Sequence, residues 1–224
     1  MRSSGWVERN SPAAPTRSAG VRRGTQILVA ESPQGPFHPW SDKPVPPFDW
    51  ECLDGTLFVT PEGDLWMVFS HEWVQVGDGE ICAILIKKDL TSAKGKPILL
   101  FHASQAPWVR QLNSKGRKGY VTDGPWLHRL PGGELLLLWS SHSESGYTIG
   151  VARSVSGQLL GPWQQDAEPL YSGDGGHCMT FRDLNGNFWV SLHHPDETPY
   201  ERPMFLPLAE EELVSPRRLV RVGM

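Results

Sequence analysis

The sequence lacks any apolar run approaching the roughly 20 residues that a membrane span needs, and stretches such as LLLLW at 135–139 are far shorter. Cysteine is also scarce. Cys52, Cys82 and Cys178 are widely spaced, which argues against a disulfide framework and a zinc cluster and predicts ordinary core residues. The formal net charge of -4 gives no basic footprint for nucleic acid. We therefore expect no membrane and no nucleic-acid partner.

Familiar catalytic motifs are missing too. The chain has no Gly-rich phosphate loop, no Gly-x-Ser-x-Gly elbow and no Cys-x-x-Cys pair. Residues 1–23 carry Arg, Ser, Pro and Ala without an apolar core run, so they do not form a signal peptide. We interpret them as a disordered or non-native segment in front of one domain, residues 24–224. The cellular compartment stays open.

Glycine, proline and tryptophan are abundant, with 23, 20 and 10 residues, which suits many short strands joined by sharp turns. Three segments repeat one pattern: Leu53–His71, Thr122–His142 and Asp174–His194. Each has an Asp-Gly pair at its head, an apolar stretch, a turn at Gly, and a second apolar stretch that ends near a His. This order predicts a strand, a tight turn and a second strand.

Two further strand-like stretches follow each of these hairpins, at 80–90 and 96–104, 146–154 and 168–172, and 202–210 and 218–222. Four strands in a unit that recurs every 50 to 70 residues or so are typical of a propeller blade. Residues 27–37 resemble residues 149–163, which indicates the outer half of an earlier blade. The pattern predicts an all-β propeller with about three and a half blades present. Residues 208–213 are compatible with a short helix.

The polar residues at the heads of the repeats are the main candidates for chemistry: Asp54, Asp123 and His177. Strand starts of this kind converge at the axis of a propeller, so we expect the three at equivalent points around it. Two carboxylates facing one cleft push their pKa values apart and give one acid and one ionised group. His177 could bind a metal or hold a carboxylate. The competing interpretations are simple Asp-Gly turns and a hydrogen-bonded core His.

Several tryptophans fall in loops or next to the expected axial funnel, among them Trp73 and Trp126. Aromatic faces stack on sugar rings, so these two are candidates for carbohydrate contacts. Most other tryptophans are expected to pack between blades. Glu72 and Glu144 could also serve as acids, although neither lies in the register of the inner strands.

Residues 24–218 resemble glycoside hydrolase family 43, whose five-bladed propellers include β-xylosidases and α-L-arabinofuranosidases. The matching stretches include GTQILVAESPQGPF, DWECLDGTLFV, VTDGPWLHR, LLLLWSSHSESGYTIGVARS and GGHCMTF. Family members hydrolyse glycosidic bonds with inversion and use three carboxylic residues. The resemblance therefore implies an oligosaccharide or polysaccharide substrate that contains xylose or arabinose.

The resemblance also implies roles for single residues. Asp54 matches the Asp that orients the general acid and adjusts its pKa. Asp123 matches the general acid itself, although the family usually has Glu there, one methylene longer. His177 matches a His of the axial channel that lies near a calcium or other ion in many members. No cofactor is required for the reaction.

The general base of the family lies in the first blade, and no residue of 1–23 matches its motif. We therefore expect an N-terminally truncated propeller. Since an inverting mechanism needs a base to activate water, this chain would then be an incomplete hydrolase and inactive as it stands. The alternative is a non-catalytic carbohydrate-binding propeller, and a weaker one is a propeller that binds proteins.

Overall fold

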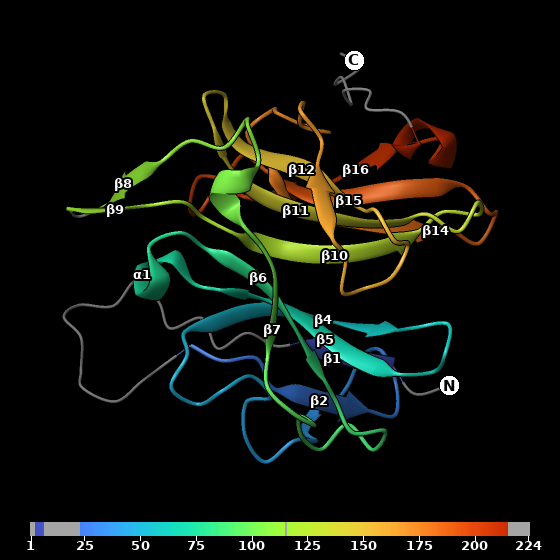
Figure 1. Cartoon of the computed structure of the whole chain (residues 1–224). Coiled ribbons are helices and arrows are strands. Elements are labelled where there is room, and N and C mark those ends of the chain that lie inside the picture. The colour runs from blue at the N-terminus through green and yellow to red at the C-terminus, as the bar shows by residue number, and fades with distance from the viewer. Residues whose placement is uncertain (1–2, 7–22, 115, 215–224) are drawn as a thin grey trace.

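The computed structural model describes residues 3–6, 23–114 and 116–214, which are built mainly from antiparallel strands (Figure 1). Within each sheet the strands lie side by side in sequence order. The first sheet contains β1 (Ser3–Trp6), β2 (Ile27–Ala30) and β3 (His38–Pro39). The second contains β4 (Cys52–Val59), β5 (Leu65–His71), β6 (Glu80–Leu85) and β7 (Ile98–His102).

A small ribbon, β8 (Leu112–Ser114) and β9 (Arg117–Gly119), precedes two larger sheets. One consists of β10 (Asp123–Arg129), β11 (Leu135–Ser143), β12 (Gly146–Ser154) and β13 (Trp163–Gln165). The other consists of β14 (Gly176–Arg182), β15 (Phe188–His194) and β16 (Arg202–Pro207). Consecutive up-and-down sheets of this kind confirm the expected all-β class and are consistent with a propeller.

Helices are short: α1 (Trp73–Val76), and the 3-10 turns η1 (Ala103–Gln105) and η2 (Glu210–Leu213). The last of these confirms the short helix expected at 208–213. None of the helices in the described residues has the length and apolar character needed to cross a membrane.

The three repeated hairpins close with the same turn. In the first, the Thr60 N–H donates to Asp64 O and the Gly63 N–H donates to Thr60 O, both at 2.9 Å. The same two bonds recur in the other two turns. In the β10–β11 turn the Leu130 N–H donates to Glu134 O and the Gly133 N–H donates to Leu130 O. In the β14–β15 turn the Asp183 N–H donates to Asn187 O and the Gly186 N–H donates to Asp183 O. The three glycines have φ between 85° and 91°, a backbone region that a side chain would strain. The sequence repeat is thus a repeat of turn geometry.

The core lies between the sheets. The β10–β13 sheet is covered on both faces, because one apolar cluster joins it to β4–β7 and a second joins it to β14–β16. Leu135 to Trp139 on β11 are fully buried. The β14–β16 sheet is covered on one face, and Met179, Phe181 and Phe205 remain 44%, 36% and 56% exposed.

One expected strand differs from the structure, and another falls outside the residues that it describes. The fourth strand of the second unit was expected at 168–172, but β13 pairs with β12 at Trp163–Gln165 and only Tyr171 makes an isolated bridge to Ile149. The cis Gly161–Pro162 peptide precedes β13, and the chain meets β12 earlier than the apolar pattern suggests. The fourth strand expected at 218–222 lies outside the described residues.

Four residues of the N-terminal segment fall within the described part of the chain. Ser3–Trp6 forms β1, which pairs antiparallel with β2, so hydrogen bonding to an existing strand gives this short piece its structure. The remainder of residues 1–22 lies outside the described residues. The domain boundary at residue 24 stays a prediction.

Candidate active site

Each of the three inner strands, β4, β10 and β14, begins with a β-bulge, at which two residues oppose one on the neighbouring strand. The first residue of each bulged pair has left-handed backbone: Asp54 with φ 57°, Gly124 with φ 48° and His177 with φ 53°. The bulges redirect the side chains at the strand heads, which lie next to one another because β10 contacts both β4 and β14.

The predicted equivalence of Asp54, Asp123 and His177 is wrong by one residue. Asp54 and His177 occupy the left-handed position, and its counterpart on β10 is Gly124. Asp123 comes one residue earlier and pairs with Ser140. An Asp-Gly pair in the sequence does not reveal which of its two residues starts the bulge.

Despite this offset, the three predicted side chains come together. One ligand atom from each of Asp54, Asp123 and His177 lies within 4.8 Å of the others. Left-handed backbone is uncommon for residues other than glycine and costs about 1 kcal/mol or more, and such outliers cluster at functional sites. The two non-glycine outliers here are therefore consistent with a site.

A single backbone amide joins the two carboxylates. The Gly124 N–H donates to Asp54 Oδ2 at 3.1 Å and to Asp123 Oδ1 at 3.0 Å. Asp54 is buried, whereas the Asp123 side chain is 30% exposed. His177 Nδ1 lies 3.6 Å from Asp123 Oδ1, beyond hydrogen-bonding distance.

Sequence reasoning missed Tyr147, which contacts Asp123 directly. The Tyr147 hydroxyl donates to Asp123 Oδ2 at 2.5 Å, and the ring is buried. Burial, together with the negative charge of Asp123, raises the pKa of Tyr147 well above its ordinary value. The phenol therefore stays protonated and acts as a donor. Tyr147 lies two strands away on β12, outside the repeated head pattern, and no motif marks it.

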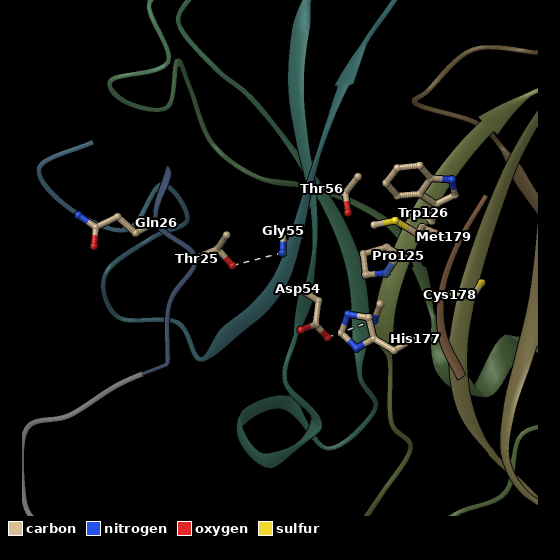
Figure 2. Close-up of a pocket in the computed structure, with 11 residues that line it drawn as sticks. Thr25, Gln26, Asp54, Gly55, Thr56, Pro125, Trp126, His177, Cys178 and Met179 are labelled. Atoms are coloured by element: carbon tan, nitrogen blue, oxygen red, sulfur yellow. Dashed lines mark hydrogen bonds between the residues drawn. The ribbon is translucent and has the colours of Figure 1, made fainter. Parts of the chain in front are cut away.

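A cavity of about 370 Å³ opens beside this cluster, within the range typical of small-ligand sites. Figure 2 shows Asp54 and His177 side by side, with Trp126 and Met179 further along the wall. Trp126 Nε1 donates to Thr180 Oγ1 at 2.9 Å, which fixes the indole. The lining residues are Thr25, Gln26, Asp54, Gly55, Thr56, Gly124, Pro125, Trp126, His177, Cys178 and Met179.

Trp73, the other tryptophan expected to contact substrate, is not among the residues that line this cavity. It lies in α1, where its ring packs so closely on Gly119 that an added Cβ there would lie 2.5 Å from Trp73 Cε3. Glu144 is exposed and pairs with Arg110, and Glu72 pairs with Arg23, so neither joins the carboxylate pair.

The cluster of Asp54, Asp123 and His177 is also the group of described residues that could hold a metal ion. Calcium takes about six to eight oxygen ligands, and this cluster offers two carboxylates and one imidazole nitrogen. The donors fit a divalent cation that keeps most of its shell as water.

Paired carboxylates beside an aromatic-walled cavity on an all-β scaffold define the class of glycoside hydrolases. The chain belongs to glycosyl hydrolases family 43, whose family model matches residues 13–210. This confirms the resemblance drawn from the motifs.

Solved structures agree. An endo-arabinase from Bacteroides thetaiotaomicron VPI-5482 is 45% identical with a TM-score of 0.85, and the match covers 93% of this chain and 71% of that one. An endo-1,4-beta-xylanase from Bacteroides thetaiotaomicron VPI-5482 is 22% identical with a TM-score of 0.67, covering 83% and 64%. A thermostable family-43 glycoside hydrolase is 20% identical with a TM-score of 0.69, covering 84% and 64%. The last two show the fold alone. A search of curated proteins found no match.

Proposed function

We propose that this chain carries the acid half of an inverting glycosidase site that acts on arabinose- or xylose-containing glycans. Asp123 donates its proton to the glycosidic oxygen as the bond to the anomeric carbon breaks, and Asp54 orients it. The observation that carries this assignment is the Gly124 N–H shared between the two carboxylates. It holds Asp123 beside the buried Asp54 side chain while leaving the Asp123 side chain partly open to solvent.

Asp54 does not suit the role of general base. In inverting enzymes the acid and the base lie about 6.5–9.5 Å apart, which leaves room for the attacking water. Carboxylate oxygens of Asp54 and Asp123 lie within 4.8 Å of each other. Asp54 is therefore a neighbour that orients the acid, and water activation needs another carboxylate.

That third carboxylate is not found around the cavity in the described part of the chain, where Asp54 is the one acidic lining residue. We therefore propose that the chain contains about three and a half blades of a five-bladed propeller and lacks the general base. The exposed apolar face of β14–β16 supports this, since a neighbouring blade would cover such a face.

Arabinose-containing glycan is the preferred substrate class. The structure that shares 45% identity is described as an endo-arabinase, and the likeness spans almost the whole chain. Trp126 lines the cavity with an apolar ring face on which a sugar could stack. Trp73 remains a proposed contact for sugar residues outside the cavity.

The alternative is a carbohydrate-binding propeller that does not cleave its ligand. The same cavity and the same Trp126 support it, and so does the missing base.

An assay on linear arabinan, an aryl α-L-arabinofuranoside and an aryl β-xyloside separates the two. We expect binding of arabino-oligosaccharides by calorimetry, and slow turnover that releases the inverted anomer, detected by proton NMR. Binding with no turnover at all supports the binding propeller. Absence of both binding and turnover on every glycoside overturns the proposal.

We also propose a weakly bound calcium or similar ion at His177. Titration with calcium should give a binding isotherm that His177→Ala weakens and that Glu144→Gln, at an exposed surface carboxylate, leaves unchanged. An unchanged isotherm in His177→Ala would place any ion elsewhere. No cofactor is required for the proton transfer itself.

A further inference from the structure

Two buried polar side chains lie behind Asp123 and outside the cavity: Ser140 on β11 and Tyr147 on β12. The His177 N–H donates to Ser140 Oγ at 2.9 Å, and the Tyr147 hydroxyl donates to Asp123 Oδ2 at 2.5 Å. Both side chains lie against Gly176 at the head of β14, where an added Cβ would meet them both. The two residues therefore lie between the head of β14 and the head of β10.

Donor chemistry fixes the direction of both bonds. A backbone N–H can only donate, so Ser140 Oγ accepts from His177. Tyr147 has a single hydroxyl hydrogen, which goes to Asp123 Oδ2, so this hydroxyl cannot rotate without breaking its bond to the acid.

Close packing holds the tyrosine ring. A Cβ added at Gly176 would lie 2.4 Å from Tyr147 Cε1 and 2.8 Å from Ser140 Oγ, so only glycine fits at this point of β14. On its other side the ring stacks on His193 with centroids 5.3 Å apart. The Tyr147 N–H also donates to Asp174 Oδ1 at 3.3 Å. The hydroxyl therefore has little freedom to follow a moving carboxylate.

We propose that Ser140 and Tyr147 are a positioning pair that locks the Asp123 carboxylate and leaves Oδ1 to carry the proton that is transferred. Oδ2 is taken by the Tyr147 hydroxyl, whereas Oδ1 faces Gly124, Asp54 and His177. An Asp is one methylene shorter than the Glu usual in the family, so its reach depends more on the orientation of its carboxylate. This inference rests on the proposed role of Asp123 as general acid.

Tyr147→Phe tests the pair, with Tyr171→Phe as a matched control. Tyr171 is equally buried, but its hydroxyl donates to Gly173 O at 3.2 Å, away from the acid. Both variants and the wild type are assayed on a nitrophenyl arabinoside, whose leaving group needs little protonation, and on an arabino-oligosaccharide, whose leaving group needs a full proton.

Tyr147→Phe should lower kcat on the oligosaccharide by about tenfold or more, with KM unchanged, and change kcat on the nitrophenyl glycoside by less than about threefold. Ser140→Ala should do the same more weakly, and Tyr171→Phe should leave both unchanged. A loss that is equal on the two substrates, or no loss, overturns the proposal, because a merely structural role would not distinguish leaving groups.

A crystal structure of each variant separates this inference from the proposed function. If the wild type cleaves no glycoside, the proposed function fails. The orientation of the Asp123 carboxylate in the crystal structures then still tests the positioning role. In Tyr147→Phe we expect its orientation to change, whereas in Tyr171→Phe it stays. An unchanged Asp123 carboxylate in Tyr147→Phe overturns the positioning role.

Discussion

The β10–β13 and β14–β16 sheets share the geometry of their first hairpin but differ in how deeply their strands are buried. Both start with a bulge and both close their first hairpin with the same turn. Yet β11 is buried from Leu135 to Ser141, whereas β15 alternates between buried and partly exposed residues. The geometry of the strand heads therefore does not depend on packing against both faces of the sheet.

The largest difference is expected between the two head residues. Asp123→Asn on β10 keeps the shape of the side chain but removes the acid, so kcat on an arabino-oligosaccharide should fall by about 10²–10⁴-fold. His177→Ala on β14 should have a smaller effect on kcat, since its ring lies 3.6 Å from the carboxylate and has no proposed role in proton transfer. Steady-state kinetics on both variants measure the difference.

Glu144→Gln is the control for this pair, because Glu144 is an exposed carboxylate outside the site. If Asp123→Asn and Glu144→Gln retained equal activity, Asp123 would not be the acid.

The second difference concerns stability. Trp139→Ala on β11 removes a fully buried side chain and should lower the free energy of unfolding by about 3–5 kcal/mol. Phe205→Ala on β16 removes a side chain that is 56% exposed and should cost about 1 kcal/mol or less. Urea unfolding followed by fluorescence and circular dichroism measures both. Equal losses would mean that the face bearing Phe205 is covered in solution.

The third difference concerns the space available for a side chain at a strand head and in a hairpin turn. Gly176→Ala places a Cβ 2.4 Å from the Tyr147 ring and should cost about 1–3 kcal/mol by overpacking. Gly132→Ala, in the β10–β11 turn, meets nothing within 4 Å and should change stability by no more than about 0.5 kcal/mol. Thermal unfolding of the two variants tests this, and a neutral Gly176→Ala would show that the ring can move aside.

The smallest effect is expected at the end of β15 and depends on pH. The Asp196 carboxylate, which accepts a hydrogen bond from His193 Nε2, raises the pKa of His193. A raised pKa stabilises the fold below the ordinary His value of about 6.5, and the stabilisation is lost as pH rises through the folded value. Asp196→Asn should therefore cost a few tenths of a kcal/mol near pH 5.5 and nothing near pH 8.5. A loss that does not vary with pH would exclude the ion pair as its cause.

Much of the fold could be predicted from the sequence, because turn glycines and alternating apolar residues are local signals. The hairpins at Leu53–His71, Thr122–His142 and Asp174–His194 all formed. The strand at 168–172 was misplaced, since an apolar pattern cannot show which segment reaches the edge of β12 first.

The site was predictable only in part. Asp54, Asp123 and His177 were found because the repeat marks the strand heads, but the one-residue offset depends on where each bulge begins. Tyr147 was missed because its contact with Asp123 crosses two strands. The sequence predicts Trp73 near the axial funnel because its loop follows the first repeat. In the structure the Trp73 ring packs on Gly119 and does not line the cavity.

The three bulges have a consequence for protein engineering. One backbone shape accepts Asp at position 54, Gly at 124 and His at 177, so the scaffold tolerates different chemical groups at the same point of each inner strand. Residues that enter left-handed backbone readily, such as Asn, Asp, His and Gly, can be exchanged at positions 54 and 177, whereas β-branched residues cannot. At position 124 an added Cβ would lie 2.9 Å from the His177 ring, so glycine is required there while His177 is present. New reactivity could be introduced at positions 54 and 177 without changing the strands that carry them.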